Sequence, residues 1–158
     1  MTARVDIFAA APSLMTDWQR SMVALAGAAR LESGLCELVQ LRASQINGCA
    51  NCLNLHSLEA LEKGETRQRL YLLPAWREAP CYTARERAAL GWTEALTRLS
   101  EGRELATAHE VLKAHFTDEE QVKLTVLINI INGWNRIAVG FGVWADAAAI
   151  KAARAAAA

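Results

Sequence analysis

The sequence predicts an all-α protein, and three observations support this prediction. Apolar residues recur at the spacing of amphipathic helices over most of the 158 residues. Capping residues and glycines stand where these periodic segments begin and end. The alternation of apolar and polar residues that marks a half-buried strand is hard to find. We therefore expect one domain over residues 1–158, a helical bundle of about six to seven helices.

The expected helices lie at about residues 12–32, 33–47, 49–63, 66–79, 83–101, 106–115 and 118–144. Ser13 is a candidate cap for the first helix. Asn47 and Gly48 close the second, because a residue in the left-handed conformation commonly ends a helix. Gly64 is a natural stop for the third helix, and the fourth is broken near Pro80.

Two capping boxes mark later helix starts. Thr83 precedes Glu86 by three residues, and Thr117 precedes Glu120 by three. In each box the threonine oxygen accepts a backbone N–H three residues on, while the glutamate reaches back to the backbone of the threonine. The second box begins a long helix that is apolar almost all round, which predicts burial in the domain or in a subunit interface.

Asn129, Asn132 and Asn135 interrupt this last helix at three-residue spacing. Buried amides need hydrogen-bond partners, so the simpler interpretation is that they bond neighbouring helices or another subunit. The alternative is that some of them line a reactive pocket. The alanine-rich tail at 147–158 is assigned no function.

Composition restricts the possible partners. Lysine plus arginine balance aspartate plus glutamate at 17 each, which argues against nucleic acid or an acidic membrane as a partner. Neither the start of the chain nor the interrupted apolar stretch 122–143 predicts a signal peptide or a membrane span. We expect a cytoplasmic protein, in which four cysteines stay reduced and a close Cys-x-x-Cys pair is redox-active or metal-binding.

Such a pair stands at the start of the third expected helix, in a Cys-x-x-Cys-x-x-x-His cluster. Cys49, Cys52 and His56 fall on one helix face, near the N-terminal end whose dipole favours thiolate over thiol. Glu37 is an isolated acid in an apolar stretch of the preceding helix, and burying it without a partner would be costly. Placed near His56, it would complete a Glu-His-Cys proton relay.

This set of groups suits thiol peroxidase chemistry. A thiolate attacks the O–O bond of a hydroperoxide and becomes a sulfenic acid, which a second cysteine converts to a disulfide. An external dithiol must then reduce that disulfide. The spacing of His56 favours Cys52 as the attacking thiolate, whereas proximity to the helix start favours Cys49.

The residues also carry a resemblance to a family. The run Glu37 to His56 is similar to the AhpD-like alkylhydroperoxidase branch of the carboxymuconolactone decarboxylase family, over roughly residues 31–137. Further similar segments are Lys63-Gly64-Glu65-Thr66, Trp76-Arg77-Glu78, Glu86-Arg87-Ala88-Ala89-Leu90 and Asn132-Gly133-Trp134-Asn135-Arg136. The resemblance implies an all-helical fold, trimers or hexamers, and an antioxidant peroxidase that reduces organic hydroperoxides with electrons from a dithiol such as a lipoyl group.

The resemblance also implies roles for individual residues. Cys52 corresponds to the peroxidatic cysteine, Cys49 to the resolving one, and Glu37 and His56 to the relay. The best-studied peroxidases of the family have a histidine between the cysteines, where this chain has Asn51. No metal or bound organic cofactor is expected.

Other interpretations of the cluster remain open. In a zinc site, Cys49, Cys52 and His56 would supply three ligands, and Glu37 is a candidate for the fourth that a closed structural site needs. The cysteine pair could also be structural and inert. A decarboxylase or isomerase of a small lactone would use the same fold without needing the pair. Cys36 and Cys81 are expected to take no part.

Overall fold

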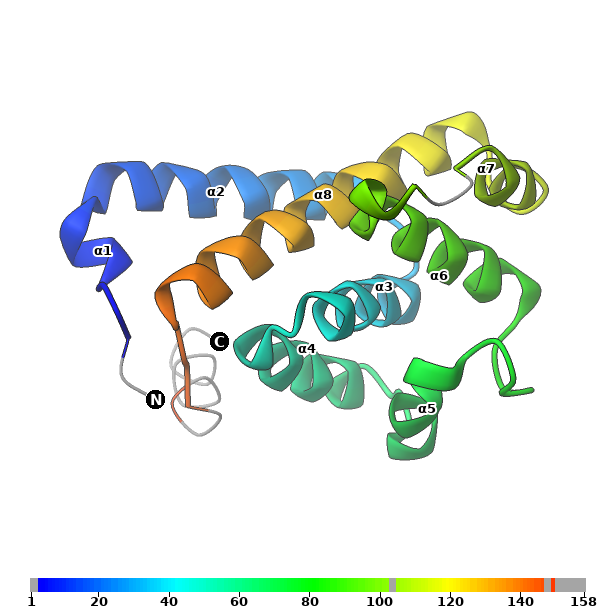
Figure 1. Cartoon of the computed structure of the whole chain (residues 1–158), viewed down its shortest axis with the longest axis horizontal. Helices are drawn as coiled ribbons and strands as arrows, with labels where there is room; N and C mark the ends of the chain where they lie inside the picture. The colour runs from blue at the N-terminus through cyan, green and yellow to red at the C-terminus, as the bar shows by residue number, and fades with distance from the viewer. Residues whose placement is uncertain (1–2, 103–104, 147–148, 150–158) are drawn as a thin grey trace.

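The computed structural model describes residues 3–102, 105–146 and 149, and in this part of the chain the secondary structure is helical without a strand (Figure 1). The α-helices are α1 (Ile7–Ala10), α2 (Pro12–Ala29), α3 (Ser33–Asn47), α4 (Ala50–Glu62), α5 (Arg67–Leu72), α6 (Ala84–Thr97), α7 (Leu105–Lys113) and α8 (Asp118–Phe141). Two short 3-10 helices are η1 (Leu73–Ala75) and η2 (Leu99–Glu101). The all-α prediction is confirmed.

Helix α3 lies at the centre and packs against α4, α6 and α8 (Figure 1). On one side its apolar residues join α6, α7 and α8 in a core that includes Val39, Leu112 and Ile128. On the other side Leu38 and Leu41 pack with Leu73 and Trp76. Because α3 is buried on both sides, residues on it are held firmly relative to α4 and α8.

The expected helix signals act as predicted at most boundaries. Gly48 ends α3 with a φ of 65°, in the left-handed region that favours glycine. Thr83 and Thr117 both form complete capping boxes, with Glu86 and Glu120 reaching back to the backbone. These short-range rules therefore place the end of α3 and the starts of α6 and α8.

The structure differs from the prediction at one cap and at several helix ends. The first expected helix begins at Pro12 as predicted, but its N-cap is Ala11 and not Ser13, and it is preceded by α1, which Asp6 caps through its carboxylate. The fourth helix ends at Leu72 and tightens into η1, because Pro74 has no N–H to continue the α-helical pattern. Helix α8 ends at Phe141, three residues before the expected end, and Gly142 is its C-cap. The tail at 147–158 lies, apart from residue 149, outside the described residues.

Helix α2 is attached to α8 by an aromatic contact. The rings of Trp18 and Trp134 meet edge to face with centroids 6.1 Å apart. A Cβ added at Gly133 would lie 3.0 Å from the Trp18 ring, so the glycine is what allows the ring to lie against α8. This contact fixes the distance between α2 and α8 along one wall of the cavity described below.

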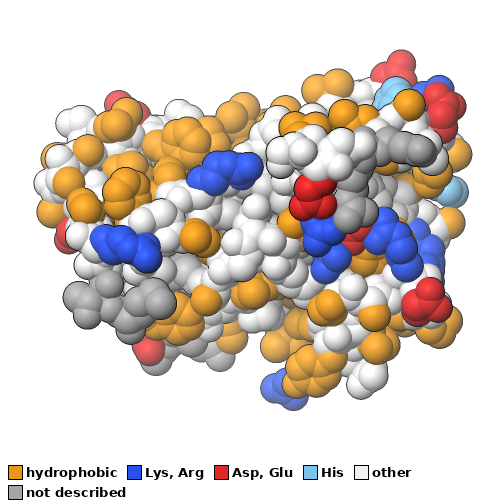
Figure 2. Space-filling view, viewed as in Figure 1, with side chains coloured by type: hydrophobic (Ala, Val, Ile, Leu, Met, Phe, Trp, Pro, Cys, Tyr) orange, Lys and Arg blue, Asp and Glu red, His pale blue; other side chains and the backbone are white. Residues whose placement is uncertain are grey.

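The outer surface carries many apolar side chains at the end of the molecule where α1, α2 and the end of α8 lie (Figure 2). The exposed apolar residues of α1, α2, the last turn of α8 and the segment after it are Phe8, Leu14, Val23, Leu25, Val139, Phe141 and Trp144. Apolar surface gathered in this way is typical of a face that another protein surface covers. In the described residues no helix is long and apolar enough to cross a membrane.

Candidate active site

A cavity of about 720 Å³ is lined by α2, α3, α4 and α8, with α1 and residues 143–145 completing its edge. Most of the lining is apolar, including Met22, Leu55, Ile131 and Trp134. Polar and ionisable side chains of α3 and α4 share one part of the wall: Glu37, Gln40, Asn51, Cys52, His56, Glu59 and Lys63. An apolar cavity with a few grouped polar residues is the usual form of a small-molecule site.

The two cysteines stand at the start of α4. Cys49 is the N-cap, and its sulfur accepts a hydrogen bond from the backbone N–H of Cys52 at 3.3 Å. The structure records a disulfide between them, with Cα atoms 5.4 Å apart. Cys52 lines the cavity, whereas Cys49 is 1% exposed and packs against Ala43 and Ile131. Only one of the two sulfurs therefore faces the space that a substrate would fill.

Glu37 and His56 lie together although 19 residues separate them in the chain. The His56 Nδ1 atom is 3.0 Å from Oε2 of Glu37. Glu37 is 2% exposed, so its carboxylate is almost completely removed from water. The partner that the isolated acid needed is therefore present across the contact between α3 and α4.

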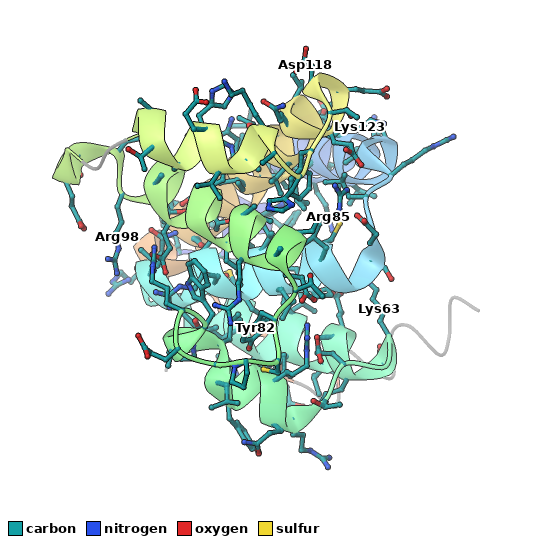
Figure 3. All side chains as sticks on the ribbon, turned by 90° about the vertical axis from the view of Figure 1, so that its right-hand side faces the viewer. Lys63, Tyr82, Arg85, Arg98, Asp118 and Lys123 are labelled. Carbon is teal, nitrogen blue, oxygen red and sulfur yellow. A yellow bond between two sulfur atoms is a disulfide. The ribbon has the colours of Figure 1, made fainter. Side chains whose placement is uncertain are left out.

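Two further charged residues belong to this group and were missed by the sequence analysis. Glu59 places Oε2 3.0 Å from the same Nδ1 atom of His56. Lys63, labelled in Figure 3 at the end of α4, lies with its Nζ 2.5 Å from Oε1 of Glu37. Both residues follow His56 at helical spacing, three and seven positions on, and this spacing was the signal available in the sequence.

Burial and charge perturb two titrating groups in the wall. Burial of His56 disfavours its charged form, but hydrogen bonds to Glu37 and Glu59 outweigh burial, and the pKa of His56 is raised. Burial together with the neighbouring Glu37 carboxylate raises the pKa of the Cys36 thiol to about 11. Cys36 thus lines the cavity as a neutral thiol, in keeping with the expectation that it takes no part.

Asn51, the residue between the cysteines, has a different neighbour. The Asn51 Oδ1 accepts a hydrogen bond from the backbone N–H of Ala145 at 2.7 Å. The Nδ2 of Asn54 donates to the backbone carbonyl of Ala145 at 3.0 Å. Val143 and Ala145 both line the cavity. Asn51 therefore holds the segment after α8 across the first turn of α4.

The asparagines of α8 bond to neighbouring helices. Asn47 donates to the side-chain oxygens of both Asn132 and Asn135 at 2.8 Å, and Asn135 donates to the Ser44 hydroxyl at 3.0 Å. Neither Asn132 nor Asn135 lines the cavity, and Asn129 is exposed. The simpler interpretation of the stripe is therefore correct: two of its three amides join α8 to the end of α3.

The group best placed to hold a metal in the described part of the chain differs from the zinc set considered from the sequence. Ligand atoms of Glu37, His56 and Glu59 lie within 4.8 Å of one another. The cysteine sulfurs are bonded to each other and stand outside this group. The Lys63 ammonium already pairs with Glu37, one of the two carboxylates in this group, so a cation would have to compete with it.

Comparison with known proteins gives concordant results. Residues 12–95 match the model of the carboxymuconolactone decarboxylase family. YdfG of Bacillus subtilis, an uncharacterised protein, is 41% identical over 106 residues, which are 67% of this chain and 72% of that protein. YnjA of Escherichia coli, also uncharacterised, is 31% identical over 97 residues, 60% of this chain and 52% of that protein.

Two solved structures share the fold. A protein of unknown function from Agrobacterium tumefaciens, described as a candidate antioxidant defence protein AhpD, superposes with a TM-score of 0.86 at 42% identity, over 92% of this chain and 99% of that one. An uncharacterised peroxidase-related protein from Silicibacter gives a TM-score of 0.71 at 26% identity, over 81% and 70% of the two chains.

Proposed function

The chain belongs to the carboxymuconolactone decarboxylase family, and on that basis we propose that it is a thiol-dependent peroxidase that reduces organic hydroperoxides. One observation carries the proposal. Cys52 shares the cavity wall with Glu37 and His56, while its partner Cys49 lies behind the wall within bonding distance. A reactive thiol, a proton carrier and a hidden second thiol are the three groups that the reaction needs.

The reaction begins with the Cys52 thiolate attacking the distal oxygen of the hydroperoxide. The O–O bond breaks, Cys52 becomes a sulfenic acid, and the departing alkoxide takes a proton from His56. Cys49 then attacks the sulfenic sulfur, so that the disulfide forms and water leaves. An external dithiol, such as a lipoyl group on a partner protein, reduces the disulfide and restores both thiols and the proton.

The proposed substrate is an organic hydroperoxide because of the size and lining of the cavity. A volume of about 720 Å³ with walls of Met22, Leu55 and Ile131 far exceeds what hydrogen peroxide would fill. Burying an apolar substituent there contributes about 25 cal/mol per Å² of apolar surface removed from water. A bulky apolar hydroperoxide should therefore react faster than hydrogen peroxide at equal concentration.

The test is a single-turnover titration of the reduced protein. One equivalent of cumene hydroperoxide should remove two thiols, and mass spectrometry should find the disulfide between Cys49 and Cys52. Cys52→Ser should consume no peroxide, whereas Cys49→Ser should react once and stop at the sulfenic acid. Cys81→Ser, a change outside the cavity, is the matched control and should behave as wild type.

Other outcomes would refute the proposal. Peroxide left unconsumed by the fully reduced protein, or one equivalent of zinc in the protein as purified, would favour the alternatives. An active Cys52→Ser protein beside an inert Cys49→Ser protein would reverse the two assigned roles.

We also propose that the chain assembles as a homo-oligomer, a trimer or hexamer, in the cytoplasm. The exposed apolar residues of α1, α2 and the end of α8 support an assembly through that face. Light scattering coupled to size-exclusion chromatography should give a mass three or six times the 17.2 kDa of one chain. A monomer at micromolar concentration would contradict this.

A further inference from the structure

Gln40 is a half-buried residue of α3 that lines the cavity. Its side-chain amide forms no hydrogen bond with any residue in the described part of the chain. Its polar neighbours on that part of the wall already bond within the protein, namely Glu37, His56, Glu59, Lys63 and Asn51. When a substrate displaces water from the cavity, the Gln40 amide must find a partner on the substrate or lose its hydrogen bonds.

The packing of α3 on α4 determines which part of the wall Gln40 occupies. Glu37 of α3 contacts His56 of α4. Further along α3, Ala43 belongs to one buried cluster with Cys52, so the two helices run antiparallel. Gln40 lies three residues after Glu37 and three before Ala43, on the same face of α3. It is therefore level with the gap between Cys52 and His56, a gap of about 6 Å along α4.

We propose that the side-chain N–H of Gln40 donates a hydrogen bond to the leaving oxygen of the hydroperoxide, a role that rests on the proposed function. Cys52 attacks the distal oxygen and His56 protonates the leaving one, so the leaving oxygen must lie between the sulfur and the imidazole. Negative charge builds up on this oxygen as the O–O bond breaks. A donor aimed at it stabilises the transition state more than the bound hydroperoxide, and the reaction becomes faster.

The amide has one competing partner, the Cys52 thiolate of the reduced protein. A hydrogen bond to the thiolate would stabilise it before any peroxide arrives and would lower the pKa of Cys52. The register of the helices favours the leaving oxygen, because Gln40 is displaced from the level of Cys52 toward that of His56. The two partners predict different results in an experiment without peroxide.

The test exchanges the amide for a side chain of similar length that has no donor. Gln40→Met should lower the rate constant for the reaction of the reduced protein with cumene hydroperoxide by about tenfold or more. Gln68→Met makes the same exchange at an exposed position of α5 outside the cavity, so it is the matched control and should react as wild type. Circular dichroism checks that both variants are folded.

Two further reagents separate the proposed role from a general disturbance of the site. The leaving group of peracetic acid is acetate, whose charge is spread over two oxygens, so a hydrogen-bond donor assists it less. Gln40→Met should therefore slow the reaction with peracetic acid by less than about threefold. Alkylation of Cys52 by iodoacetamide involves no leaving oxygen, and its rate and pH midpoint should stay those of the wild type.

Three results for Gln40→Met would overturn the inference: an unchanged rate with cumene hydroperoxide, equal slowing with cumene hydroperoxide and peracetic acid, or a displaced alkylation midpoint. In each of these cases the wild type still reduces the hydroperoxide, and the proposed function stands. A reduced wild-type protein that consumes no hydroperoxide would instead refute the proposed function, and this role of Gln40 with it.

Discussion

Replacing Gly133 by alanine tests whether the Trp18 contact holds α2 against α8. The new Cβ would lie 3.0 Å from Cζ2 and 3.2 Å from Cη2 of Trp18. Carbon atoms prefer separations of about 3.5 to 4.0 Å, so the ring must retreat by roughly half an ångström. The Trp18 ring already meets Trp134 edge to face, which restricts its retreat.

The magnitude follows from two opposing effects. Inserting a methyl group into a well-packed contact costs about 1 to 3 kcal/mol. Exchanging glycine for alanine inside a helix stabilises by about 1 kcal/mol. Gly140 lies on the same helix, and a Cβ there meets nothing within 4 Å, so Gly140→Ala has the second effect alone. The difference between the two variants therefore isolates the packing cost of about 1 to 3 kcal/mol.

Thermal and urea unfolding of the two variants give this difference directly. For a chain of this length, each 1 kcal/mol corresponds to roughly 2 to 4 °C in Tm. Gly140→Ala should melt above wild type, and Gly133→Ala should melt below Gly140→Ala by at least about 2 °C. Equal melting of the two alanine variants would refute the packing argument for α2.

Three further predictions concern the site and the buried charges. Asn51→Ala removes the hydrogen bond to Ala145, so amide exchange in residues 143–146 should become faster and the free energy of unfolding should fall by about 1 kcal/mol. The exposed Asn129→Ala should change neither the exchange rate nor the free energy of unfolding. Glu94→Gln removes a buried carboxylate that binds two arginines, so the free energy of unfolding measured in urea should fall by about 3 to 5 kcal/mol. The exposed Glu78→Gln should lower it by less than about 0.5 kcal/mol. Burial opposes the Glu94 charge, but its hydrogen bonds lower its pKa, so this stabilisation is present above pH 4.5 and should fade as the pH falls below that value. With a pKa of about 11 instead of 9.0, Cys36 should react with iodoacetamide at pH 8 about a hundredfold more slowly than an ordinary thiol, and an equal rate would contradict its burial.

The sequence by itself determined the fold class and most helix boundaries. Helical periodicity, the two capping boxes and Gly48 act over three or four residues, so their effects can be worked out without the rest of the chain. The same local spacing put Cys49 and Cys52 at the start of one helix and His56 one turn beyond Cys52 on it. The missed break at Pro74 was also local and could have been foreseen.

Only the tertiary structure decided how these residues are used. Glu37 meets His56 because α3 and α4 pack together, and Asn51 meets Ala145 because the chain after α8 returns over α4. The same packing leaves Cys52 on the cavity wall and Cys49 behind it. Such contacts join residues from 19 to 94 positions apart, and their existence depends on how whole helices bury their apolar faces, which no short window of sequence specifies.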